Sequence, residues 1–228
     1  MTASAFKDRM PGAAMAKWLS VVGIGEDGIT GLGSQARRRI EAAEFVFGGR
    51  RHLRHAAALI RGESRAWPSP FEGVVAQILA LRGRAVCVLA SGDPMHFGIG
   101  ALLAREIDVT EMTVLPGPSA FGLAAARLGW ALQDCDAISL HGRSIERIRP
   151  LLHPGRRVLA VTSDGDAPAR IAGLITADGF GASRFIVLEA LGGTHERVRS
   201  FRAAAVGEAR FDDLNVVAIE VEPGAEAR

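Results

Sequence analysis

Glycine-rich turns that interrupt apolar stretches are the features of this sequence with the clearest chemical meaning. The apolar run Val86–Ala90 stops at Ser91-Gly92-Asp93-Pro94, and a second apolar pattern with further glycines follows it. This order is typical of a buried strand, a tight turn and a helix that begins at Pro94. Since glycine allows a ligand to approach the backbone, the turn is either a ligand site or a plain strand-to-helix turn capped by Asp93.

A second glycine loop follows the first apolar stretch of the chain. Gly23, Gly25 and Gly28 have the spacing of a dinucleotide-binding loop, in which backbone amides surround a phosphate. Glu26 and Asp27 lie within this loop, where their carboxylates would repel a pyrophosphate. No acidic residue stands at the distance that a ribose contact requires. An oxidoreductase that binds NAD is therefore the less favoured alternative.

Composition restricts the classes of protein to which the chain can belong. A net charge of +2, with 48% hydrophobic and 23% charged residues, is typical of a soluble globular protein and indicates neither a nucleic acid nor a membrane partner. Cys87 and Cys135 form neither a metal-binding set nor a disulfide framework, which fits a cytoplasmic location. No apolar run is long enough to span a membrane. Residues 1–16 are mostly small and polar and predict a disordered leader.

Strand and helix patterns alternate between these loops, which predicts an α/β fold with a largely parallel sheet covered by helices. The stiff turn Pro116-Gly117-Pro118 marks a change of character, and Ser119 is placed to cap a helix of small residues. We therefore expect two α/β domains, residues 17–115 and 116–223, followed by a tail at 224–228.

In the second domain we expect strands at 184–189 and 214–221, with a helix around 195–201 between them. Ligands of open parallel sheets bind beyond the carboxyl ends of the strands. The glycine loops should therefore line one cleft.

Three loops, in this order, resemble the tetrapyrrole methylase family: residues 23–28, the Gly92-Asp93-Pro94 turn with Gly98-Ile99-Gly100, and Leu115 to Ser119. Ser139-Leu140-His141-Gly142-Arg143 and Glu189-Ala190-Leu191-Gly192 are similar to its precorrin-6Y methyltransferase branch, the CbiE-type enzymes or the amino-terminal half of CobL. The resemblance covers residues 18–221. It implies two α/β domains with S-adenosylmethionine in the cleft between them, a precorrin-type tetrapyrrole substrate and a homodimer.

The resemblance also implies which residues form the site. A sulfonium is already activated, so positioning should carry most of the rate and few catalytic side chains are needed. Phe97 and Ile99 fit an apolar helix core equally well, and Glu26 stands where many family members have proline. His141 is either a group that assists proton movement or a structural histidine. One or more of Arg50, Arg51 and Arg54 can join Arg143 in binding the carboxylates of the substrate. The residues implied for the cofactor are Gly25, Gly92, Asp93, Phe97, Ile99, Ser119, Ala120, Thr162 and Ser163, and those for the substrate are Glu26, Arg50, His141 and Arg143; no metal ligand is expected.

The extent of the reaction and the substrate class leave alternatives. In this branch the full conversion adds two methyl groups and removes an acetate carboxyl, and a CbiT-like methyltransferase and decarboxylase shares the work. Only residues 222–228 follow Val221, so we expect one methylation, at C5, with the acetate intact. A methylase of the same fold that acts on a macromolecule is the second hypothesis, and the near-neutral charge argues against RNA as its substrate.

Overall fold

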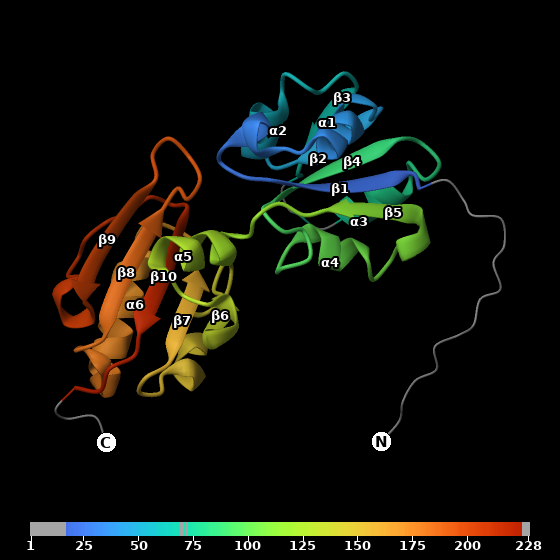
Figure 1. Ribbon diagram of the computed structural model, residues 1–228. Helices are drawn as coiled ribbons and strands as arrows, with labels where there is room; N and C mark the ends of the chain where they lie inside the picture. Colours follow the sequence, from blue (N-terminus) through green and yellow to red (C-terminus); the bar gives the residue numbers. More distant parts are fainter. Residues whose placement is uncertain (1–16, 69–70, 72, 225–228) are drawn as a thin grey trace, which may run out of the picture.

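The computed structural model describes residues 17–68, 71 and 73–224, which form two α/β units joined at residues 116–119 (Figure 1). Each unit has its own five-stranded sheet. The predicted leader, residues 1–16, and residues 225–228 of the predicted tail lie outside the described residues. The boundary at residue 116 stays a prediction, and it falls in the connection between the two sheets.

All strand pairs of the first sheet are parallel, and the strand order is β3-β2-β4-β1-β5. β1 and β4 are central and, apart from Ser20 and Ser91, contain no polar side chain, because a parallel sheet is covered on both faces. In Figure 1, α1 and α2 cover one face and α3 and α4 the other. The bounds of the strands are β1 Leu19–Ile24, β2 Phe45–Gly48, β3 Glu63–Ala66, β4 Val86–Ser91 and β5 Met112–Leu115. The bounds of the helices are α1 Ser34–Glu41, α2 Arg50–Ala56, α3 Val74–Leu79 and α4 Ile99–Leu103, with 3₁₀ turns at Gly28–Gly31 and Val109–Glu111.

Side chains alternate between the two faces of this sheet. Val21 and Val88 pack with Val74 and Ile78 of α3, whereas Val22 and Leu89 pack on the opposite side with α1. Successive side chains of a strand point to opposite faces of the sheet, so each apolar run contributes to the hydrophobic core on both faces.

The second sheet has the order β6-β7-β10-β8-β9, and only β6 and β7 are parallel. β10 pairs antiparallel with both β7 and β8, and β9 pairs antiparallel with β8. The expectation of a largely parallel sheet was therefore wrong for this half. The predicted helix around 195–201 was also wrong, because Arg197–Arg202 is the edge strand β9. The bounds are β6 Cys135–Ser139, β7 Arg157–Val161, β8 Arg184–Glu189, β9 Arg197–Arg202 and β10 Asn215–Glu220.

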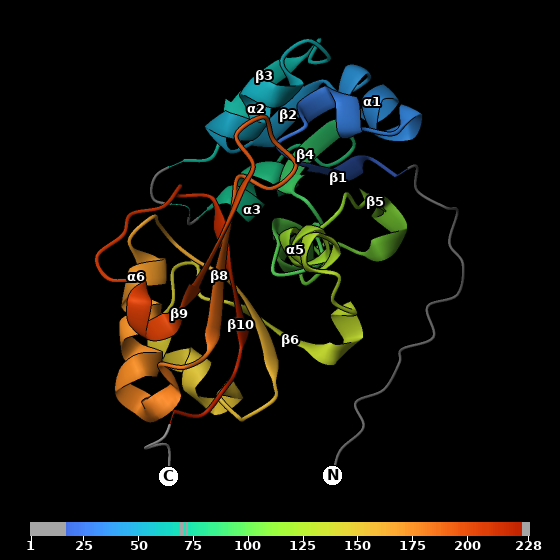
Figure 2. The same cartoon turned by 60° about the vertical axis from the view of Figure 1, so that its left-hand side comes forward.

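Helices α5 and α6 cover opposite faces of the second sheet, as Figure 2 shows. Ser119 caps α5 as predicted, since its hydroxyl accepts from the amide of Gly122 at 3.0 Å. Small residues such as Ala124 let α5 lie close to Leu159 and Leu188 of the sheet. The bounds are α5 Ala120–Leu128 and α6 Ala167–Ile175, with 3₁₀ turns at Leu132–Asp134, Ile145–Leu151 and Ala203–Ala205 and a π turn at Thr176–Phe180.

Two further expectations needed correction. The helix after the Gly-Asp-Pro turn begins at Ile99 rather than at Pro94, because residues 94–98 form successive turns. Strand β3 was not predicted, since Glu63–Ala66 is polar and mostly exposed. In the described part of the chain, no helix is long and apolar enough to cross a membrane.

Candidate active site

A cleft of about 670 Å³ lies between the two units, at the carboxyl ends of β1 and β4. The exits of β6, β7 and β8, the entry of β10 and the start of α5 supply its other walls. The site residues expected from the sequence line this cleft, with two exceptions: of the three candidate arginines of α2, Arg51 lines the cleft, whereas Arg50 and Arg54 do not. The predicted residues that meet there are Gly25, Glu26, Gly92, Asp93, Phe97, Ile99, Ser119, Ala120, His141, Arg143, Thr162 and Ser163.

Three glycine loops cross at the floor of the cleft. The amide of Gly92 donates to the carbonyl of Ile24 at 3.2 Å, and the amide of Gly117 donates to the carbonyl of Gly92 at 3.0 Å. A Cβ atom on Gly23 would lie only 1.8 Å from the Gly92 carbonyl oxygen. Gly92 itself has a left-handed φ of 53°, which favours glycine. These glycines are therefore required by the packing of backbone on backbone, which the dinucleotide spacing did not indicate.

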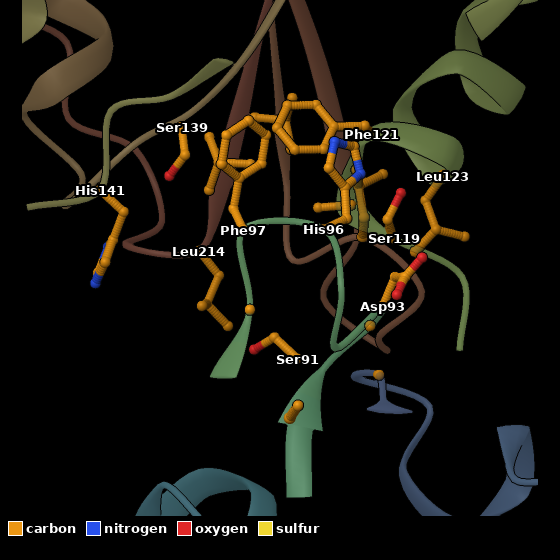
Figure 3. A pocket seen from close by; sticks show the side chains of 18 of the residues that line it. Ser91, Asp93, His96, Phe97, Ser119, Phe121, Leu123, Ser139, His141 and Leu214 are labelled. Atoms are coloured by element: carbon orange, nitrogen blue, oxygen red, sulfur yellow. The ribbon is translucent and has the colours of Figure 1, made fainter. Parts of the chain in front are cut away.

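Backbone polar groups and short side chains surround this crossing. The carboxylate of Asp93 accepts from the amide of Met95 at 2.8 Å, so it stabilises the turn rather than a helix. The Ser119 hydroxyl is engaged at the first turn of α5. Both side chains line the cleft and face the same part of it in Figure 3. This side of the cleft offers a preformed, polar and largely backbone surface.

Three aromatic rings form an apolar wall above the glycine loops (Figure 3). The ring centroid of His96 lies 4.9 Å from that of Phe97 and 4.7 Å from that of Phe121. Phe97 has a φ of 57° although it is not glycine, and half of its surface is exposed. Such backbone strain in an exposed aromatic residue is typical of a functional site. The guanidinium of Arg143, from the second unit, lies 5.9 Å from the Phe97 ring.

A polar cluster forms the wall nearest α2. Arg51 donates to the carboxylate of Glu26 and, at 3.2 Å, to the hydroxyl of Ser91. His52 lies 2.9 Å from that hydroxyl, and burial, followed by the charges of Arg51 and His55, lowers the pKa of His52 to about 4. The described residues offer no hydrogen-bond partner to His52 Nδ1 or His55 Nε2. The ion pair with Glu26 therefore neutralises the charge of Arg51 within the cleft. Because its pKa is lowered, the His52 ring is neutral near pH 7.

Buried hydrogen bonds hold the loops of the second unit in place. Asn215 is 5% exposed; its side-chain oxygen accepts from the Thr162 hydroxyl at 2.7 Å, and its amide donates to the carbonyls of Asp164 and Asp212. Sequence reasoning missed this residue because two of its partners, Thr162 and Asp164, are distant from it along the chain. Other lining residues that it missed are His52, Trp67, His96, Phe121, Leu123, Asp213 and Leu214.

No group of His, Cys, Asp or Glu side chains in the described ranges is arranged to hold a metal ion. The cleft instead combines an aromatic wall, backbone amides and a few charged groups. Such a site suits an organic ligand with both apolar and polar parts.

Comparisons with known proteins place these features in context. The profile described as Tetrapyrrole (Corrin/Porphyrin) Methylases matches residues 19–206. A decarboxylating precorrin-6Y C(5,15)-methyltransferase from Sinorhizobium sp is 53% identical over 95% of this chain, which covers 52% of that protein. A cobalt-precorrin-7 C(5)-methyltransferase from Salmonella typhimurium is 31% identical over 82% of this chain and 92% of its own length. The chain thus spans about half the length of the first relative and nearly all of the second.

Solved structures give the same picture of the fold. The precorrin-6Y methylase CbiE from Archaeoglobus fulgidus superposes with a TM-score of 0.68 at 25% identity, over 91% of this chain and 99% of that one. A uroporphyrin-III C-methyltransferase from Thermus thermophilus, complexed with S-adenosylhomocysteine, has a TM-score of 0.69 at 20% identity over 88% of this chain and 91% of its own. The second likeness concerns the fold alone.

Proposed function

Since this chain belongs to the tetrapyrrole methylase family of S-adenosylmethionine-dependent methyltransferases, we propose that it methylates a precorrin-type macrocycle at C5 during cobalamin biosynthesis. The observation that carries this proposal is the cleft, in which the glycine loops and an aromatic wall built from both units face polar loops of the second unit. Its volume of about 670 Å³ lies within the range of small-molecule sites.

The residues of the cleft fit the cofactor. Gly25, Gly92, Asp93, Ser119 and Ala120 lie at the loop crossing, and Thr162 and Ser163 present polar groups from the loop after β7. Phe97 and Ile99 provide apolar contacts for the same ligand. When bound, S-adenosylmethionine supplies a methyl group activated by a sulfonium. The chain then has to orient the ligands and exclude water, which shared walls from two units achieve.

The charged groups divide between ligand binding and structure. Arg143 is exposed and, among the described residues, forms no ion pair, so it is the cation available to a carboxylate of the macrocycle. Arg51 is already neutralised by Glu26, and Arg50 lies outside the cleft lining. We therefore assign carboxylate recognition to Arg143 and place Glu26 and His141 beside the substrate.

The proposed reaction is one methylation without loss of carbon dioxide. Its support is that the chain covers 92% of a relative named for C5 methylation alone but only 52% of a relative named as decarboxylating. We propose that decarboxylation belongs to a separate CbiT-like module, as a partner or a fused domain. The homodimer and the cytoplasmic location stay predictions.

Ligand binding and product mass test the proposal. S-adenosylhomocysteine should raise the melting temperature of the chain in a concentration-dependent way, whereas NAD should not. With the reduced macrocycle and S-adenosylmethionine, mass spectrometry should show a single added methyl group and an intact acetate. Stabilisation by NAD alone would favour the oxidoreductase. Two methyl groups or a loss of carbon dioxide would show that the division of labour is wrong.

A further inference from the structure

His141 is the cleft group whose geometry best suits proton removal, and this inference rests on the proposed function. Its Nδ1 atom lies 3.3 Å from the carbonyl oxygen of Thr162. A carbonyl oxygen can only accept, so Nδ1 carries the proton and Nε2 keeps its lone pair. Among the described residues, no group is hydrogen-bonded to Nε2, and the side chain is exposed to the cleft. The structure thus fixes the tautomer that a base requires.

The loop that carries His141 is held by side chains of the second unit. The Ser163 hydroxyl accepts from the amide of Gly142 at 2.9 Å and donates to the carbonyl of Leu140 at 3.2 Å. Gly142 makes the sharp turn with a φ of 65°, and the Leu140 amide donates to the Val161 carbonyl at 2.8 Å. Two neighbouring strand exits, those of β6 and β7, therefore fix both the backbone and the ring of His141.

Methylation of a bridging carbon requires a base. The carbon carries a hydrogen, and its π electron pair forms the new bond to the methyl group while the carbon–sulfur pair stays on sulfur. The ring then holds one positive charge, which is removed when the hydrogen leaves as a proton and its bond pair returns to the π system. The methyl group arrives on one face of the ring, so the departing proton lies toward the other.

His141 lies across the cleft from the glycine loops. In Figure 3, Asp93 and Ser119 lie on one side of the cavity and His141 lies on the opposite side. Thr162 and Ser163, which are also assigned to the cofactor, adjoin His141, so the methyl donor has to lie at the glycine loops for this geometry. A flat macrocycle between them would present one face to the methyl donor and the other to His141. We propose that His141 Nε2 accepts the proton released from the methylated carbon.

The other ionisable groups of the cleft are engaged or badly placed. The carboxylate of Glu26 pairs with Arg51. Arg51 also donates to Nε2 of His52 at 3.1 Å, so the lone pair of that nitrogen is already occupied by a hydrogen bond. Asp213 accepts from the amide of Gly165 at 3.0 Å and pairs with Arg210. Asp93 and His96 lie on the side of the glycine loops, beside Ser119 (Figure 3). Among the described histidines that line the cleft, His141 combines a free acceptor nitrogen with a position across the cavity from Asp93 and Ser119.

The test compares His141→Ala with His153→Ala, an exposed histidine of the same unit that does not line the cleft. Loss of a general base lowers kcat by about 10²- to 10⁴-fold. We expect this loss only in His141→Ala, with the affinity for S-adenosylhomocysteine unchanged and part of kcat restored by added imidazole. Nitrogen-15 NMR of the wild-type protein should show the Nδ1–H tautomer in the signal that His141→Ala removes.

The outcomes separate the inference from the function on which it rests. If the wild-type chain neither binds S-adenosylhomocysteine nor transfers a methyl group, the proposed function fails and the role of His141 fails with it. If the wild-type chain is active and His141→Ala keeps its kcat, only the inference is overturned. A neutral Nε2–H tautomer in the NMR spectrum would overturn it as well.

Discussion

Gly92→Ala tests the loop crossing at the floor of the cleft. An alanine there must hold a left-handed φ of 53°, which costs about 1–2 kcal/mol for an L residue. Its Cβ atom would also lie 2.6 Å from the Pro118 carbonyl oxygen, and relieving such overlap costs about 1–3 kcal/mol more. Gly129→Ala is the matched control, because Gly129 has a φ of 66° but no atom within 4 Å of the added Cβ.

The difference between these variants isolates the crossing. For a chain of this length about 1 kcal/mol corresponds to a shift of roughly 2–4 °C in melting temperature. If the overlap costs about 2 kcal/mol, Gly92→Ala should melt about 4–8 °C below Gly129→Ala. Because Ser119 must move away with Pro118, Gly92→Ala should also bind S-adenosylhomocysteine more weakly, whereas Gly129→Ala should bind it normally. Equal melting temperatures and equal affinities would refute the packing described for Gly92.

Three further predictions concern other sites. Arg199→Met leaves the carboxylate of Glu189, which is 5% exposed, without its ion pair, so the melting temperature should fall by an amount corresponding to about 3 kcal/mol. Adding Glu189→Gln should recover most of this loss, and no recovery would contradict the pairing. Burial raises the pKa of the Cys87 thiol to about 12, and it also raises the pKa of the Cys135 thiol. Since Cys135 is only partly buried, a thiol reagent should label Cys135 first in the native protein and Cys87 only on unfolding. The pKa of His52 is lowered from 6.5 to about 4 in the folded chain, so between these pH values only the unfolded chain takes up the proton. The free energy of unfolding should therefore fall as pH falls through that window, and it should fall less steeply in His52→Gln. Equal pH dependence in both proteins would exclude the effect.

The fold and the meeting of the glycine loops could be predicted because both depend on local patterns. Apolar runs marked β1 and β4, and the carboxyl ends of parallel strands meet at one edge of a sheet, so the loops at Gly25 and Gly92 had to converge. The start of α5 was predicted from Ser119, whose hydroxyl satisfies an amide at the first turn.

The remaining features depend on contacts that a linear pattern does not contain. β3 and β9 are edge strands with mostly exposed side chains, so backbone pairing with β2 and β8 defines them rather than an apolar period. Arg50 and Arg51 are adjacent, and the rotation of about 100° per residue along α2 decides which of them faces the cleft. Asn215 joins loops that are about fifty residues apart, as its bond to Asp164 shows.

The central place of β10 in the second sheet has a consequence for synthesis on the ribosome. The strands of the first sheet are all complete by Leu115, so that unit can fold while the rest of the chain is being made. In the second unit β7 and β8 each lack their shared partner, β10, until residues 215–220 emerge and insert between them. Because Asn215 begins that strand, the walls of the cleft are fixed only once β10 is in place. A nascent chain stopped before β10 would hold two apolar strand edges open to aggregation.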